Sequence, residues 1–178
     1  MTDDAADAPA ASQTDDAADV PAALPPRRLG LVAGLAVVVI ALDQLTKHWA
    51  VSRLPGRPPF EVIGSLQFNL AHNTGAAFSF GADKGIGPWV SLVAIVVVLG
   101  MALGMTSRFL LGAVAAGLVA GGALGNLADR AFRGDAGFMH GAVVDFIDLQ
   151  WWPVFNVADS AIVVGAVLLV VAGLRAPA

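Results

Sequence analysis

The sequence predicts an all-α membrane protein, a four-helix transmembrane bundle with short strands in the segments that connect the helices. Two observations lead to this prediction. Hydrophobic residues make up 57% of the chain and charged residues 13%, with a mean hydropathy of +0.73, whereas a soluble domain has about 25% charged residues. Four segments also approach the roughly 20 apolar residues that cross a bilayer. A soluble fold of 178 residues could not bury so much apolar surface.

Residues 1–26 differ from the rest of the chain, and we expect them to form a disordered tail. They contain six aspartates, no Lys or Arg, and otherwise mainly Ala and Pro, so they offer almost nothing to bury. They lack the positive and then apolar pattern of a secretory signal. Removing their six carboxylates from the total of 14 leaves eight acidic and ten basic residues, a net charge of +2, for the predicted membrane domain, residues 27–178.

The predicted helices span about residues 29–51, 88–106, 109–129 and 154–174. The first has a purely apolar part of only 14 residues, Leu29 to Leu42, which covers about 21 Å. Its continuation therefore carries Asp43 and Lys47 to the far interface. These two side chains are four residues apart in the favourable order for a helical ion pair, so we expect them to support the end of this helix.

Two long connections, residues 52–87 and 130–153, join the helices, and each contains a predicted strand. Alternating polar and apolar residues predict a strand at 66–70, and residues 143–147 are a second candidate. With four spans, both connections lie on one side of the bilayer, opposite the two termini. Four tryptophans fall at this interface, where indole rings prefer the headgroup layer: Trp49, Trp89, Trp151 and Trp152.

Positive charge gives only a weak indication of orientation. Arg27 and Arg28 precede the first helix and favour a cytoplasmic N-terminus. The full count does not, because four Lys or Arg lie on the side of the termini and six on the side of the long connections. We follow the first helix and expect both termini in the cytoplasm and both long connections outside it.

A repeated Asn-x-Ala-Asp sequence marks the candidate site. It ends the third helix at Asn126–Asp129 and begins the fourth at Asn156–Asp159. Because these helices are antiparallel, the two carboxylates should lie at the same membrane face, each with an amide three residues away. Small residues at every fourth position predict close helix packing and an inward-facing Asp129; they are Gly117, Gly121 and Gly125.

Two carboxylates in a membrane site are costly and therefore indicate a function. Because they repel each other, one can hold a proton while the other stays charged. The charged member can take a proton from water, and the neutral one can hydrogen-bond the carbonyl of a peptide bond. The pattern therefore predicts aspartic proteolysis by Asp129 and Asp159. Helix capping is the alternative for Asp159, which lies near a helix N-terminus.

Other polar residues give weaker signals. Asp145 and Asp148, in and beside the second candidate strand, could join the carboxylates or be solvated. Asn73 follows the first candidate strand and could hold a substrate backbone or form a turn. The three histidines lack an HExxH spacing, no GxSxG sequence occurs, and cysteine is absent. We therefore expect neither a metal nor another cofactor.

Five motifs, in order along the chain, resemble the lipoprotein signal peptidase family, whose members are also called type II signal peptidases. The resemblance covers about residues 27–174. The motifs are Asp43-Gln44-Leu45-Thr46-Lys47, Asn73-Thr74-Gly75-Ala76-Ala77-Phe78, Gly125-Asn126-Leu127-Ala128-Asp129-Arg130, Val143-Val144-Asp145-Phe146 and Phe155-Asn156-Val157-Ala158-Asp159.

The resemblance implies an aspartyl endopeptidase of the bacterial cytoplasmic membrane with a small extracytoplasmic β-cradle. Such an enzyme removes the signal peptide of prolipoproteins just before a Cys that carries diacylglycerol, and it is sensitive to the cyclic peptide globomycin. Membrane lipids are expected partners and nucleic acid is not. The implied catalytic residues are Asp129 and Asp159. The implied substrate-binding residues are Asn73, Asn126, Arg130 and Asn156, and structural support is assigned to Asp43, Lys47 and Asp145. The acidic tail lies outside the family pattern.

Two other classes of protein remain open. A transporter or channel would also use intramembrane carboxylates, but near the membrane midplane and on broken helices, whereas both carboxylates here lie at helix ends. A non-catalytic membrane scaffold would explain the glycines but not the repeated Asn-x-Ala-Asp.

Overall fold

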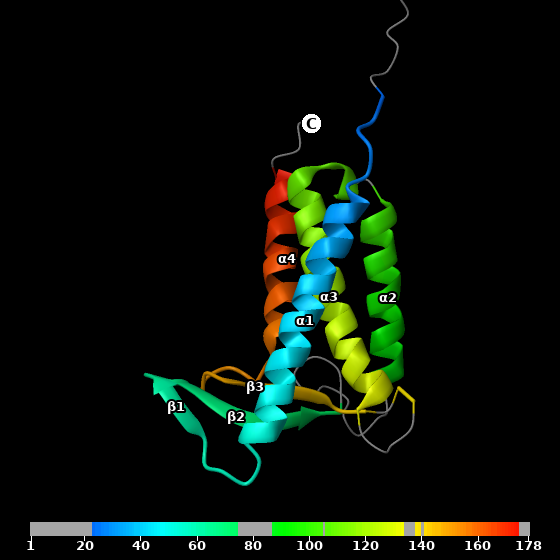
Figure 1. The fold of residues 1–178 in the computed structure, drawn as a ribbon. Coiled ribbons are helices and arrows are strands. Elements are labelled where there is room, and N and C mark those ends of the chain that lie inside the picture. Colours follow the sequence, from blue (N-terminus) through cyan, green and yellow to red (C-terminus); the bar gives the residue numbers. More distant parts are fainter. Residues whose placement is uncertain (1–22, 75–86, 105, 134–137, 140, 175–178) are drawn as a thin grey trace, which may run out of the picture.

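The computed structural model describes residues 23–74, 87–104, 106–133, 138–139 and 141–174. Four helices run side by side (Figure 1): α1 Leu29–Arg53, α2 Gly87–Leu103, α3 Leu110–Phe132 and α4 Val157–Leu174, with a short 3-10 helix η3, Thr106–Arg108, before α3. α1 begins and α4 ends at one end of this bundle, and a small sheet lies at the opposite end. Strands from both long connections therefore lie together.

Three of the described helices, α1, α3 and α4, are long and apolar enough to cross a membrane. α2 is strongly apolar too, but it has 17 residues, which span about 25 Å. It ends at Leu103 rather than at residue 106 because the chain turns at Gly104, whose carbonyl accepts a hydrogen bond from the Ser107 hydroxyl at 3.2 Å. The described helices thus make a membrane fold with three clear candidate spans, and the predicted count of four is not established by length.

The sheet has three antiparallel strands in the order β1-β2-β3: Phe60–Ile63, Leu66–Asn73 and Val143–Asp148. β2 is longer than expected and includes Asn73, which pairs with Val143. β1 was not expected from the sequence. It exists because the chain reverses after Ile63 through Gly64, whose φ of 56° suits glycine, and then pairs with the start of β2.

α3 occupies the middle of the bundle because small residues let its neighbours come close. A Cβ atom on Gly117 would lie 2.7 Å from the Leu35 Cβ, and one on Gly121 would lie 2.6 Å from the Val39 Cβ, both on α1. A Cβ on Gly125 would lie 2.7 Å from the Asp43 carboxylate. This stripe matches the predicted close approach of two helix backbones, and it brings polar side chains of α1 and α3 together at the end of the bundle near the sheet.

Candidate active site

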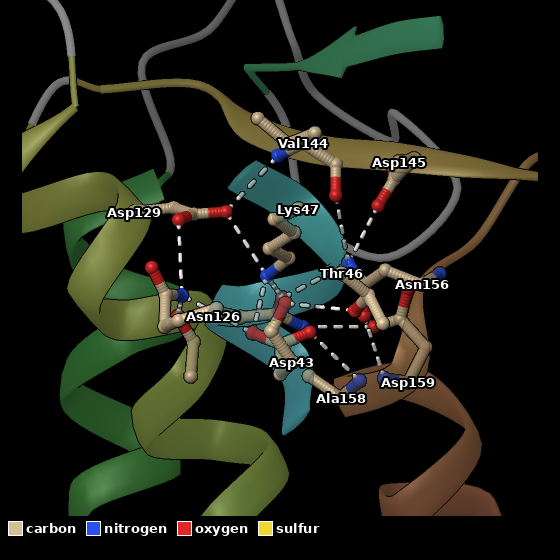
Figure 2. Close-up of polar contacts among 12 residues, drawn as sticks. Asp43, Thr46, Lys47, Asn126, Asp129, Val144, Asp145, Asn156, Ala158 and Asp159 are labelled. Carbon is tan, nitrogen blue, oxygen red and sulfur yellow. Dashed lines mark hydrogen bonds and ion pairs between the residues drawn. The ribbon is translucent and has the colours of Figure 1, made fainter. Parts of the chain in front are cut away.

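A cluster of polar side chains is buried where the helices meet the sheet (Figure 2). The side chains come from α1, α3, β3 and the start of α4, and each residue is less than a tenth exposed: Asp43, Lys47, Asp129, Arg130, Asp145 and Asn156. Burying this many charges is unfavourable unless each one finds a partner. The contacts of each carboxylate therefore define what it can do.

Lys47 lies at the centre of the cluster and is fully buried. Its Nζ is 2.8 Å from the Asp43 carboxylate, as the spacing of four predicts, and 2.9 Å from that of Asp129. It also donates to the Asn126 Oδ1 at 2.8 Å. One ammonium thus joins the end of α1 to α3. The Asp43–Lys47 pair therefore supports the end of α1, as expected, and also belongs to the polar cluster.

Asp129 is surrounded by cations and donors. Its Oδ1 is 2.9 Å from the Arg133 guanidinium, and its Oδ2 pairs with Lys47 and accepts the Val144 backbone N–H at 3.1 Å. The Gln44 Nε2 also donates to it at 3.2 Å. α3 continues to Phe132, so Asp129 lies in its last turn, one turn before Arg133. These contacts give Asp129 two cationic partners and fasten β3 to the bundle.

Asp159 has a different set of partners and is half-buried. The Asn126 Nδ2 donates to its Oδ1 at 2.8 Å, and the Asn156 backbone N–H donates to its Oδ2 at 3.2 Å. In return, the Asp159 N–H donates to the Asn156 Oδ1 at 2.9 Å. This reciprocal pair is a capping box at the start of α4. Asp159 therefore does cap the helix, as the alternative interpretation expected. Among the described residues, Asp159 forms no salt bridge.

Asp145, which could have been solvated, is instead 3% exposed on β3. It accepts the Asn156 Nδ2 at 2.6 Å and a hydrogen bond from the Asn73 side chain. Burial, and next the negative charge of Asp159, raise the pKa of Asp145 from 3.8 to about 7. Asn156 thus bonds Asp145 with its side chain and Asp159 with its backbone, so these two carboxylates share one neighbour and influence each other.

The other expected site residues lie around this pair. Asn126 connects Lys47 to Asp159, because its Oδ1 accepts a hydrogen bond from Lys47 and its Nδ2 donates one to Asp159. The Arg130 guanidinium is attracted electrostatically to Asp159, Asp145 and Asp129. Asp148 does not belong to the cluster: it accepts hydrogen bonds from Gln67 and the Gln150 backbone at the far end of β3, and these bonds lower its pKa.

The sequence reasoning missed three members of the cluster. Gln44 and Arg133 both contact Asp129 and each other, and the Val144 N–H donates to the same carboxylate. The spacing of four between Asp129 and Arg133 was a readable signal. The other two contacts depend on how α1 and β3 pack against α3.

The fold and the cluster define a class, a membrane enzyme whose buried carboxylates lie at one end of a helix bundle beneath a small sheet. Two solved structures of bacterial membrane enzymes share this fold, with TM-scores of 0.73 and 0.71 and 29% identity. The matches cover 86% and 87% of this chain and 93% and 99% of the solved chains.

The sequence narrows this class to one family. The family model described as Signal peptidase (SPase) II matches residues 35–175. A lipoprotein signal peptidase of Rhodococcus jostii is 51% identical over 148 residues, which cover 82% of this chain and 72% of the relative. One of Mycobacterium avium is 47% identical over 152 residues, covering 83% and 80%. The chain therefore belongs to the signal peptidase II family and is a peptidase, as the resemblance implied.

Proposed function

We propose that this chain is an aspartyl endopeptidase that removes the signal peptide from diacylglyceryl-modified prolipoproteins by cleaving before the lipidated Cys. The family supports the reaction class, and the relatives are lipoprotein signal peptidases. The enzyme would lie in the bacterial cytoplasmic membrane with α2 as its fourth span. Both termini would then be cytoplasmic, and the cluster and sheet would be extracytoplasmic, where exported precursors present their cleavage sites.

The proposed chemistry uses two carboxylates that share one proton. Asp159 is the more exposed, and the hydrogen bonds to its carboxylate from the described residues come from the neutral Asn126 and Asn156. Asp145 accepts a hydrogen bond from the same Asn156 and has a pKa of about 7. Near neutral pH the pair can hold one proton between them. The charged member takes a proton from a water molecule, and the neutral one donates a hydrogen bond to the scissile carbonyl as negative charge develops on it.

The coupling of Asp145 to Asp159 is the observation that carries this version of the mechanism. The repeated motif favoured Asp129 as the second carboxylate. Among the described hydrogen bonds and ion pairs, Asp129 is connected to Asp159 through Lys47 and Asn126. Its oxygens are already occupied by two cations and a backbone N–H. We therefore assign Asp129 to support of β3 and keep the Asp129–Asp159 pair as the second candidate.

The amides and Arg130 have proposed substrate roles. Asn156 orients both carboxylates, and Asn73 and Asn126 each bond one of them, so all three surround the position of the attacking water. Arg130, whose charge acts on both carboxylates, would limit the negative charge near the scissile bond. Globomycin would bind at the same carboxylates, and membrane lipids would surround the helices.

The experiment is cleavage of a diacylglyceryl prolipoprotein by detergent-purified enzyme, with the unlipidated precursor as a matched substrate. We expect D159N and D145N to lose cleavage. D129N should keep measurable cleavage activity per amount of folded protein, and the wild type should stay active in EDTA. Loss in D129N with full activity in D145N would restore the sequence-derived pair. Inhibition by EDTA that Mg²⁺ reverses would support a metal mechanism, and equal cleavage of the unlipidated precursor would refute the substrate assignment.

A further inference from the structure

Arg53 and Arg57 are two cations that the proposed peptidase chemistry does not use. Six basic residues lie on the side of the long connections, against the usual bias toward the cytoplasmic side. Three of them, Lys47, Arg130 and Arg133, act on the carboxylate cluster. Arg53 and Arg57 are exposed, and within the described part of the chain neither forms a salt bridge. Their charge therefore needs another explanation.

The two arginines line a hollow of about 490 Å³ between the end of α1 and the start of β1. A hollow of this volume falls in the usual range of small-molecule sites. Its remaining wall is apolar and includes Trp49, which is 39% exposed, and Phe60, which is 61% exposed. A wall of this kind with two guanidinium groups suits a ligand that has acyl chains and an anionic head.

The hollow also lies at the depth where lipid headgroups are expected. Leu45, one turn before Trp49 on α1, is 67% exposed and would face the acyl chains. β1 also exposes Val62 and Ile63, and this strand lies at the sheet end of the bundle (Figure 1). Exposed apolar side chains on a strand at the bundle end indicate contact with the membrane surface rather than with water.

We propose that this hollow binds one anionic phospholipid, with its phosphate between Arg53 and Arg57 and the upper parts of its acyl chains against Trp49 and Phe60. Guanidinium groups are well suited to phosphate because they donate parallel hydrogen bonds to two oxygens. Glu61, exposed on β1, is the one carboxylate among the described residues of β1 and β2. The two positive charges of Arg53 and Arg57 exceed its single negative charge. The proposal requires the membrane location but does not depend on proteolysis.

The test is lipid retention by the full-length protein. Wild type is reconstituted in nanodiscs of phosphatidylcholine with a minor fraction of phosphatidylglycerol of matched chain length, released into detergent, and analysed by native mass spectrometry. We compare R53Q/R57Q with R27Q/R28Q, which removes the same charge at the opposite end of α1, and with R53K/R57K, which keeps the charge. At about fivefold per cation, R53Q/R57Q should lose about 30-fold in affinity for phosphatidylglycerol.

The supporting result is retention of one phosphatidylglycerol by wild type and R27Q/R28Q, weaker retention by R53K/R57K, and loss in R53Q/R57Q. Equal loss in both glutamine variants would mean general charge attraction and would overturn the site. Equal retention of phosphatidylcholine by wild type would overturn the anionic class. All four substituted arginines are exposed, so circular dichroism should show the same fold in every variant. These measurements use no substrate, so they stand apart from the outcome for the peptidase.

Discussion

Replacing Asp145 with Asn should make the folded protein more stable at pH 8 while it removes cleavage. The raised pKa means that the charged form of Asp145 is disfavoured by folding. Asn has the same shape and stays neutral at every pH, and its Oδ1 can still accept from the Asn156 Nδ2, which bonds Asp145 at 2.6 Å. The variant therefore keeps the packing and removes the cost of the charge.

The size of the effect follows from the shift in pKa. Folding moves the pKa of Asp145 from 3.8 to about 7, which is about three pH units or about 4 kcal/mol. Because the folded pKa is raised, the stabilising contribution is fully present below about pH 4 and is lost as pH rises toward about 7. D145N should show no such loss from this residue. The free energy of unfolding of D145N should thus exceed that of the wild type by an amount that grows from about pH 4 to about pH 7 and stays constant above pH 7.

The assay is thermal unfolding in detergent, followed by tryptophan fluorescence at several pH values between 4 and 8. D129N is the matched control, because it also exchanges one buried carboxylate for an amide. It removes the partner that Asp129 provides to Lys47 and Arg133, and breaking a buried ion pair typically costs 3–5 kcal/mol. D129N should therefore melt lower than wild type at all these pH values. A D145N variant that melts lower at pH 8, or that cleaves at the wild-type rate, would refute the reasoning.

Three further predictions follow from the site and the fold. The kcat/KM of the wild type should fall as pH rises through about 7, since the proton on Asp145 is then lost from the pair; a profile flat from pH 6 to 9 would contradict this. Deletion of residues 2–24 should leave specific activity unchanged, and Pro25 must remain because its carbonyl accepts a hydrogen bond from the α2–α3 connection; a large loss in purified enzyme would indicate that the tail docks. In this cysteine-free chain, S65C should react with an impermeant thiol reagent on intact cells and F109C only after permeabilisation, and the reverse pattern would invert the topology.

The sequence predicted the parts of the fold that depend on composition along the chain. Apolar runs located the helices, alternation located β2, and residues 143–147 were correctly identified as a second candidate strand, β3. β1 was missed because Phe60-Glu61-Val62-Ile63 is short and mainly apolar, so it has no clear period of two. The end of α2 was misplaced because the chain turns at Gly104 before the polar residues that suggested the boundary.

In the candidate site, the sequence located the residues more reliably than it assigned their partners. The repeat indicated that two acidic motifs would meet at one end of the bundle, and both lie in the cluster of Figure 2. The burial of Asp145 was not readable, because it requires β3 to pack on the bundle through the Val144 N–H. The contacts that distinguish Asp129 from Asp159 are likewise tertiary, and only helix packing supplies them.

The two copies of Asn-x-Ala-Asp differ because they lie at opposite ends of their helices. Asp129 lies in the last turn of α3, where the helix dipole is unfavourable to a carboxylate, and it is accordingly paired with Lys47 and Arg133. Asp159 lies in the first turn of α4, where the Asn156 backbone N–H and the Asn126 side-chain amide donate to it and the described residues provide no salt bridge. A carboxylate fixed in ion pairs is poorly suited to exchanging protons, whereas one held by neutral donors beside a second carboxylate can do so. Helix polarity is therefore the physical reason to expect support from Asp129 and chemistry from Asp159.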